Sequence, residues 1–505
     1  MIIKGYQFFD SNSGKIMRIQ GVDYYPRPNA GTLDSGISVD MYTKQYRHIW
    51  ERDIQEFKEL GLNAIRIYSV DPGKDHTDFM CALNNVGIYV VVGLASYCPT
   101  CAITRDEAPD CYPMELKLRG QDIINEFSKY SNTLGFSAGN EVNHFVPPGK
   151  HPQWNAPCLK KFISDMRAYV VNCNTDVSMR KVPIGLVTAD SDRDVNALYY
   201  NCLSDPLETL ENAEWFGINA YLYCNGNVTE LNESEGFRKL KESFKSYNYS
   251  IPVLLTEFGC LSKTFPTING FEAQRPFLQA KWLGTESALR DLFAGGFAFE
   301  YSIEKSVGNT AYPFKVFGEQ NYGIGYFSPE NCDDQTIPCK YVPLPSFDKL
   351  KNAFQEARDG YDNKLTLENY TFDPHRMQRS DCPENFPNLK SFSWKSDLVH
   401  NRRCPKRSDS EFTCANRHNH KVLMKFVIIG NVMILLLTIT KIFERWNDGK
   451  KTDHLDSMIF AKNSLRIAFE SDNLIPDKKM ESQTELNTVT DSLNSNKHVG
   501  NTFAL

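Results

Sequence analysis

Two glutamates, Glu141 and Glu257, stand at the ends of the apolar runs Leu134–Asn140 and Pro252–Glu257. A pair of carboxyl groups can break a glycosidic bond when one donates a proton to the leaving oxygen and the other attacks the anomeric carbon. In the retaining form of this chemistry the two groups lie about 5–5.5 Å apart, and their surroundings must separate their pKa values. One glutamate after a strand is usually a helix N-terminal charge or a surface ion partner, but two in matching positions predict a catalytic pair.

Polar residues near these glutamates fit the same chemistry. Arg66 lies inside an apolar run, and a buried arginine requires an acidic partner. Together with Tyr221 it could hold Glu257 ionised, while Asn140 could bind a sugar 2-hydroxyl. Tyrosines at the ends of runs could stack on sugar rings, although each also fits a core position: Tyr25, Tyr68, Tyr221 and Tyr301.

Eight short apolar runs alternate with amphipathic stretches over the first 345 residues. Each run is nearly all apolar, as a strand buried on both faces should be. The runs are Met17–Asp23, Asn63–Ser69, Gly87–Gly93, Leu134–Asn140, Val182–Thr188, Glu214–Tyr221, Pro252–Glu257 and Gly296–Tyr301, and the helical patterns between them include Thr43–Leu60, Glu115–Ser131 and Cys158–Val171. This alternation predicts an α/β fold, a (β/α)₈ TIM barrel, whose chemistry lies at the C-terminal ends of the strands. A doubly wound open sheet is the alternative, but the first run is not followed by the glycine-rich loop typical of that fold.

Composition narrows the class of protein. Charged residues make up 23% of the 505 residues, which is typical of a globular enzyme. The net charge is −6 and the sequence has no basic stripe, so we expect no nucleic-acid partner. The fourteen cysteines all lie between Cys81 and Cys414, and four N-glycosylation acceptors also precede residue 420: Asn227, Asn232, Asn248 and Asn369. This distribution indicates an oxidising compartment. Cys98 and Cys101 are the only closely spaced cysteine pair, and no second pair follows at zinc-site spacing, so we expect a disulfide and no metal.

The last third of the chain predicts a membrane anchor. Residues 346–420 are polar with three cysteines and are expected to form a stalk. An uncharged run at 426–440 is 15 residues long, and flanking residues could extend it to a single transmembrane helix at 421–443. Residues 444–505 have the composition of a disordered, cytoplasmic tail. The N-terminus reads as a strand and turn rather than a signal peptide, which leaves the export route open.

A set of motifs is specific enough to suggest a family. The motifs are Arg66-Ile-Tyr68, Gly135-Phe-Ser-Ala-Gly-Asn-Glu-Val142, Gly217-Ile-Asn-Ala-Tyr221, Thr256-Glu-Phe-Gly-Cys260 and Gly295-Gly-Phe-Ala-Phe-Glu-Tyr301. Over residues 1–345 the chain resembles glycoside hydrolase family 72, the fungal glycolipid-anchored β-1,3-glucanosyltransferases. The resemblance implies a cell-surface enzyme, at the plasma membrane or in the cell wall, that needs no cofactor. It would cut internal β-1,3-glucan bonds and transfer the new reducing end to the non-reducing end of an acceptor glucan.

The resemblance also implies residue roles. Glu141 would be the acid/base and Glu257 the nucleophile. The donor site would be lined by Asn140, Tyr68, Tyr221 and Tyr301, with Asp106 near the sugar subsites. A family disulfide matches Cys224 and Cys260, and Cys202 would pair with Cys332 or Cys339.

The chain departs from the family in several places. Tyr25 replaces a usual glutamine, and Trp50 and Phe79 occupy the two positions of a family disulfide as an expected apolar contact. An enlarged loop carries Cys98, Cys101 and Cys111. The polar residues after the apolar run do not form a glycolipid-anchor signal, so a single membrane helix is the expected substitute.

Two further functions stay open at this level. One is a hydrolytic β-glucanase on the same fold, and the other is a membrane-tethered protein that binds glucan without cleaving it. The presence of both glutamates argues against the second. Nothing in the sequence fixes the oligomeric state.

Overall fold

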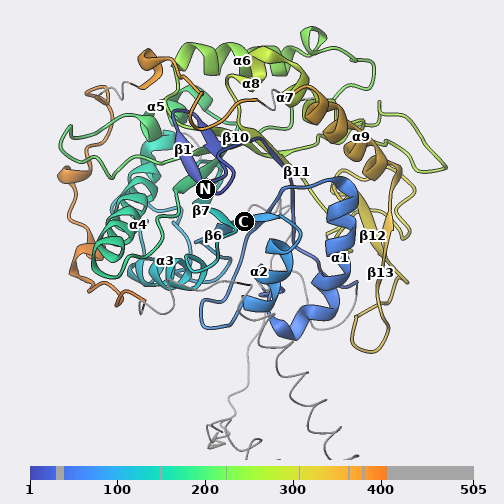
Figure 1. The fold of residues 1–505 in the computed structure, drawn as a ribbon, viewed down its shortest axis with the longest axis horizontal. Coiled ribbons are helices and arrows are strands. Elements are labelled where there is room, and N and C mark those ends of the chain that lie inside the picture. Colours follow the sequence, from blue (N-terminus) through green and yellow to red (C-terminus); the bar gives the residue numbers. More distant parts are fainter. Residues whose placement is uncertain are drawn as a thin grey trace, which may run out of the picture. The chain divides into compact units, whose positions relative to one another are not determined.

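A closed barrel of eight parallel strands forms the centre of the computed structural model (Figure 1). The structure describes residues 1–29, 39–147, 150–222, 224–305, 307–361, 364–377, 381–405 and 414. Neighbouring strands follow the order β10-β11-β4-β5-β6-β7-β8-β9. Their bounds are β4 Ile19–Asp23, β5 Ala64–Ile67, β6 Tyr89–Gly93, β7 Thr133–Asn140, β8 Ile184–Ala189, β9 Phe216–Asn219, β10 Val253–Phe258 and β11 Gly295–Ala298. Each strand overlaps one of the eight runs and extends beyond it by at most one residue, so the predicted barrel is confirmed.

Most residues of the barrel strands are apolar or small, apart from polar residues such as Arg66 and Glu257. Nearly all residues of the eight strands are buried, as parallel strands covered on both faces require. Gly295 at the start of β11 shows the tightest fit, with a φ of +118°. A Cβ atom there would lie 2.1 Å from the carbonyl oxygen of Ile19 in β4, so only glycine lets the two strands pair.

Helices cover the outside of the barrel. They are α1 Arg47–Leu60, α2 Thr77–Asn84, α3 Met114–Phe127, α4 Ala156–Val177, α5 Arg193–Asn201, α6 Glu235–Tyr247, α7 Leu278–Thr285, α8 Ser287–Arg290 and α9 Pro345–Asp359. Short 3₁₀ helices lie at Lys44–Tyr46, Val142–Phe145, Pro152–Trp154, Leu231–Glu233, Pro374–Met377, Leu389–Ser391 and Lys395–Leu398. The three helical patterns named above correspond to α1, α3 and α4, which confirms those predictions.

Small sheets complete the fold at two places. The N-terminal strands β1 (Ile2–Lys4), β2 (Gln7–Phe9) and β3 (Ile16–Met17) pair antiparallel, as the predicted strand and turn require. Phe8 from β2 joins a buried apolar cluster with residues near the N-terminal ends of the barrel strands, so this end of the barrel is filled by apolar side chains. A second antiparallel pair, β12 (Gly325–Ser328) and β13 (Lys340–Pro343), follows the last barrel strand.

The helix α9 belongs to the barrel rather than to a stalk. It packs against α7 and α1, and its buried residues Phe347, Leu350, Phe354 and Ala357 lie on one helical face. At the contact with α7, a Cβ on Gly284 would lie 2.4 Å from the Cα of Ala357. The expected domain boundary at residue 345 therefore falls at the start of α9, a helix that packs against the other barrel helices.

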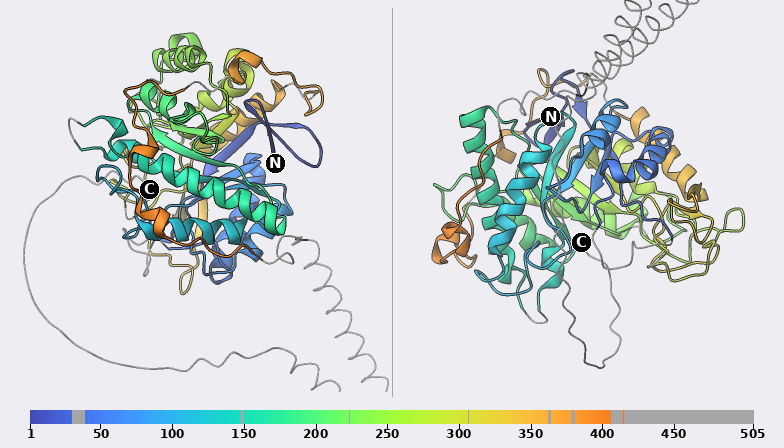
Figure 2. Two further views of the ribbon diagram at one scale, coloured as in Figure 1. Left: turned by 90° about the vertical axis from the view of Figure 1, so that its left-hand side faces the viewer. Right: turned by 90° about the horizontal axis from the view of Figure 1, so that it is seen from below.

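Residues 364–377 and 381–405, here called the strap, also lie against the barrel helices (Figure 2, orange). Disulfides join Cys382 to Cys202 and Cys404 to Cys173, and a third links Cys414 to Cys81. The Lys117 ammonium of α3 donates to the strap carbonyls of Ser396 and Val399, at 2.7 and 3.0 Å. A polar stalk over 346–420 is therefore not supported in the described residues, because disulfides and buried hydrogen bonds hold this polar sequence on the helix layer.

The predicted membrane segment is not among the residues described. The apolar stretch at 421–443 and the tail at 444–505 both lie outside them. Within the described ranges, no helix is long and apolar enough to cross a membrane.

Candidate active site

Glu141 and Glu257 are both placed at the C-terminal ends of barrel strands. Glu141 directly follows β7, and its backbone N–H donates to the Val187 carbonyl in β8 at 2.9 Å. Its φ of +50° lies in the left-handed region, which is unfavourable for a residue with a side chain and is typical of functional positions. Glu257 is the second-last residue of β10, and 6% of its surface is exposed.

Three donors surround the carboxylate of Glu257. The Arg66 guanidinium and the Tyr68 hydroxyl each donate to Oε1 at 2.9 Å, and the Tyr221 hydroxyl donates to Oε2 at 2.7 Å. These contacts confirm the expected partners of Arg66 and Tyr221. All three contacts are hydrogen bonds that a carboxylate oxygen accepts from a donor.

Arg66 is fully buried and joins Glu257 to a second acid, Asp23 at the end of β4. Its Nη1 lies 3.0 Å from Asp23 Oδ1. Burial raises the pKa of Asp23 well above its usual value, the charge of Arg66 lowers it, and the charge of Glu257 raises it further. Two acids thus share one arginine, and burial favours the neutral form of Asp23.

Glu141 lies in a different electrostatic setting. Burial raises its pKa to about 7, and the charge of Glu257 adds to this rise, while a hydrogen bond from Asn219 and the charge of Arg66 oppose it. The Asn219 amide donates to Glu141 Oε1 at 2.9 Å. A carboxyl group with a pKa about 7 can both donate and accept a proton near neutral pH.

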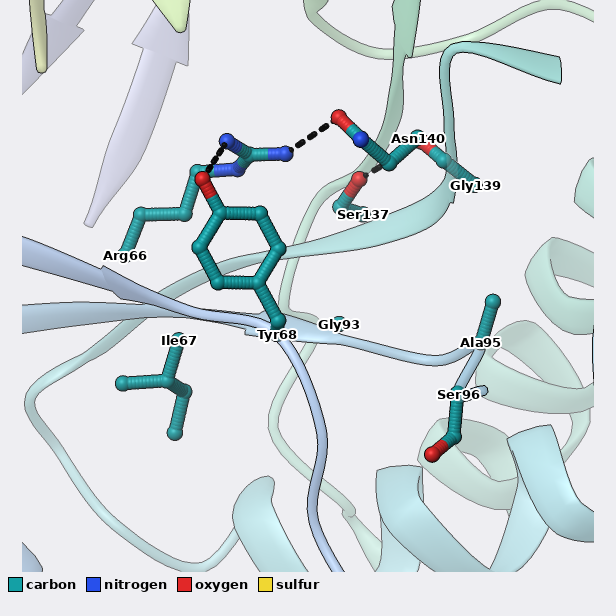
Figure 3. Close-up of a pocket in the computed structure, with 9 residues that line it drawn as sticks. All are labelled: Arg66, Ile67, Tyr68, Gly93, Ala95, Ser96, Ser137, Gly139 and Asn140. Atoms are coloured by element: carbon teal, nitrogen blue, oxygen red, sulfur yellow. Dashed lines mark hydrogen bonds between the residues drawn. The ribbon is translucent and has the colours of Figure 1, made fainter. Parts of the chain in front are cut away.

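A continuous polar network connects the two glutamates. Besides Glu141, the Asn219 amide reaches Asn140 Oδ1 at 3.2 Å, and that oxygen accepts from Arg66 Nη2 at 2.6 Å. Arg66 in turn contacts Glu257. Figure 3 shows Arg66, Tyr68 and Asn140 around a pocket whose wall also includes Ala95 and Ser96, on the loop that leaves β6.

Aromatic rings form a wall beside Tyr221. The Tyr322 ring centre lies 5.5 Å from that of Tyr221 and 5.3 Å from that of Phe299. The buried guanidinium of Arg275 fixes this wall, because it donates to the carbonyls of Gly259, Phe299 and Tyr322. Burial lowers the pKa of Arg275 to about 10.

Tyr301 is a correction to the predicted site. It is fully buried, stacked on Tyr341 at 4.4 Å and packed against Phe57 of α1 at 5.3 Å. The last strand ends at Ala298, three residues earlier than predicted, so Tyr301 has already turned into the core between barrel and helices. Phe299 is the aromatic residue that reaches the site instead.

Tyr25 and Asp106 are not joined to the network of Glu141 and Glu257 by any contact within the described ranges. Tyr25 is buried beneath the Arg27 guanidinium, and its hydroxyl accepts from the Val39 N–H at 3.0 Å. Asp106 is exposed and accepts a hydrogen bond from Thr104 at 2.6 Å. Their predicted sugar contacts therefore stay predictions.

Besides Phe299, the sequence reasoning missed four residues of the site. Asp23 and Asn219 end barrel strands β4 and β9, so the rule that identified the glutamates could have found them. Tyr322 and Arg275 lie in long connections, where no periodicity marks them.

The disulfides near the site agree only in part with expectation. Cys224–Cys260 and Cys98–Cys101 are confirmed, and Trp50 and Phe79 do form an apolar contact, with ring centres 5.5 Å apart. The pairing of Cys202 is wrong, because it bonds to Cys382 in the strap while Cys332 and Cys339 bond to each other.

Sequence comparison finds relatives that are named 1,3-beta-glucanosyltransferases. The chain is 30% identical over 359 residues to the 1,3-beta-glucanosyltransferase PGA4 of Candida albicans, and 29% identical over 376 residues to GAS5 of Saccharomyces cerevisiae. These alignments cover 71% and 74% of this chain, and in each case 66% of the relative. The chain thus spans just under two thirds of the length of these relatives.

Solved structures give a matching result. Saccharomyces cerevisiae Gas2p, solved in complex with laminaritetraose and laminaripentaose, is 26% identical with a TM-score of 0.55. That match covers 81% of this chain and 75% of Gas2p. The glucanosyltransferase family itself matches residues 1–310, which hold every strand of the barrel and both glutamates. The chain therefore belongs to the glucanosyltransferase family, glycoside hydrolase family 72.

Proposed function

We propose that this chain is a retaining β-1,3-glucanosyltransferase that remodels the glucan of a fungal cell wall. One observation carries the proposal: two glutamates in one polar network have opposite surroundings. Glu257 faces a guanidinium and two tyrosine hydroxyls, whereas burial raises the pKa of Glu141 to about 7. This division matches the needs of a nucleophile and an acid/base.

In the first step, Glu257 attacks the anomeric carbon of an internal glucosyl unit while Glu141 gives its proton to the leaving oxygen. The glycosidic bond breaks, one glucan fragment leaves with a free hydroxyl, and the new reducing end is bound covalently to Glu257. Asn140 is placed to bind the sugar 2-hydroxyl, since its side chain lies between Arg66 and Asn219.

In the second step, Glu141 is ionised and accepts the proton of an incoming hydroxyl. When that hydroxyl belongs to the non-reducing end of an acceptor glucan, a new glycosidic bond forms and Glu257 is released. When water enters instead, the product is a shortened glucan. The aromatic wall of Tyr221, Tyr322 and Phe299 offers ring faces for an acceptor sugar beside Glu257.

The product profile tests the proposal. We expect the protein, incubated with one laminari-oligosaccharide of defined length, to form products longer than that substrate. Mass spectrometry or anion-exchange chromatography measures the lengths. Shorter products alone would identify a hydrolytic β-glucanase, and unchanged substrate would point to a binding protein.

The pH dependence gives a second test. Glu141 must be protonated in the first step, so kcat/KM for the donor should fall above about pH 7, by about tenfold per pH unit. Asn219→Ala removes a hydrogen bond that favours the charged form, so the alkaline limb should move to higher pH.

Ser137→Ala is the matched control, because Ser137 lines the same pocket but donates to the Gly139 carbonyl rather than to a glutamate. Its profile should overlay that of the unmodified protein. If the alkaline limb of the kcat/KM profile stays in place or moves to lower pH in Asn219→Ala, this result would contradict the acid/base role of Glu141.

The cellular setting is part of the proposal. Asn227, Asn232, Asn248 and Asn369 are all exposed, as glycosylation acceptors must be. Seven disulfides pair all fourteen cysteines, which fits an oxidising compartment. We propose a cell-surface enzyme held by the apolar stretch 421–443, with β-1,3-glucan chains as donor and acceptor.

A further inference from the structure

Tyr97 is the one aromatic residue among the exposed large apolar side chains of the described chain, with 64% of its surface exposed. A single exposed apolar residue needs no explanation by itself. Its position does, because the two residues before it, Ala95 and Ser96, line the pocket that also contains Tyr68 and Asn140 (Figure 3). Tyr97 is therefore the exposed residue that directly follows this part of the pocket wall along the chain.

The backbone around Tyr97 is fixed on both sides. The Ser96 N–H donates to the Cys101 carbonyl at 3.0 Å, and the Cys98 N–H donates to the Ser96 carbonyl at 3.0 Å. The Ser96 hydroxyl also bonds the Ser69 hydroxyl, on the segment that leaves β5. Tyr97 is thus an exposed ring on a rigid support rather than on a loose loop.

The turn that the Cys98–Cys101 disulfide closes has a strained backbone. Thr100, between the two cysteines, has a φ of +63°, which a β-branched residue adopts only under constraint. A disulfide that closes a loop of so few residues contributes less to global stability through chain entropy than one that closes a long loop. Its effect is therefore local, on the conformation of the turn that carries Tyr97.

We propose that Tyr97 is a stacking platform for a glucosyl unit of the glucan that extends beyond the cleavage site, and that the Cys98–Cys101 disulfide positions it. This inference rests on the proposed function. The C–H faces of a β-glucosyl ring pack on an aromatic face, and a rigid tyrosine supplies that face at a low cost in entropy. The bound unit lies outside the pocket, so only donors long enough to reach Tyr97 make the contact.

The test compares a long donor with a short one. In Tyr97→Ala we expect KM for laminariheptaose to rise about three- to tenfold with kcat unchanged, while KM for laminaritriose stays constant. Tyr97→Phe should restore the long-donor value, because the ring face is retained. Leu207→Ala is the matched control, as Leu207 is 83% exposed and lies on the segment after α5.

The disulfide is tested in the same assay. Cys98→Ser together with Cys101→Ser should reproduce the long-donor loss, and adding Tyr97→Ala should cause little further loss, because both changes remove one contact. Additive effects would overturn the positioning role of the disulfide. Equal losses for both donors, or no loss in Tyr97→Ala, would overturn the stacking platform while leaving the proposed function intact. An unmodified protein that neither binds nor converts either donor would overturn both.

Discussion

Glu257→Gln is expected to reduce glucan transfer at least about a thousandfold without unfolding the protein, because it removes the group that attacks the anomeric carbon. The amide oxygen can still accept from Arg66 and Tyr68, and the amide N–H can donate to the Tyr221 hydroxyl, which then accepts instead of donating. Initial rates on a laminari-oligosaccharide donor measure the loss, and circular dichroism verifies the fold.

A surface glutamate supplies the control for this substitution. Glu235 forms an exposed pair with Lys239 in α6, so Glu235→Gln makes the same chemical change away from the site and should leave the rate unchanged. An unchanged rate in Glu257→Gln itself would remove the covalent mechanism and favour a glucan-binding role. Binding of the intact donor to this variant, measured by calorimetry, would show that the substrate site is preserved.

Glu141→Ala is expected to slow transfer by about 10²–10⁴-fold, since both steps lose their proton donor or acceptor. An aryl laminari-oligosaccharide with a good leaving group needs little proton donation, so its first step should survive and the covalent intermediate should accumulate. Azide should then restore part of the turnover, because this anion attacks without help from a base.

The configuration of the azide product distinguishes the two glutamates. In Glu141→Ala, azide displaces Glu257 from the covalent intermediate, so the product should be the β-glycosyl azide. In Glu257→Ala, azide can only enter from the face that Glu257 leaves empty, which gives the α-glycosyl azide. Nuclear magnetic resonance of the product separates these outcomes, and exchanged configurations would reverse the assigned roles.

The barrel and the positions of the candidate catalytic pair could be predicted because their signals are local. A strand buried on both faces is an apolar run, and the residue at its C-terminal end faces the mouth of the barrel. That rule located Glu141 and Glu257, and it extends to Asp23 and Asn219, which the sequence reasoning did not use. It failed at Tyr301, because the run continues three residues past the end of β11.

The features that could not be predicted from the sequence depend on contacts between segments far apart in the chain. Arg275 donates hydrogen bonds to three carbonyls from three separate segments, and the residues next to Arg275 in the sequence do not indicate these partners. Disulfide connectivity likewise cannot be deduced from spacing, so Cys202 was paired with the wrong partner. The apolar face of α9 is visible in its sequence, but the polar residues around this face favoured the prediction of a stalk.

The strap sets a practical limit on how short an active fragment of this protein can be made. A fragment that ends at residue 310, where the family match ends, would lose α9 and leave Cys81, Cys173 and Cys202 with unpaired thiols. These thiols could form mismatched bonds during secretion, and the apolar surface beneath α9 would be open to solvent. Recombinant production should therefore extend through Cys414.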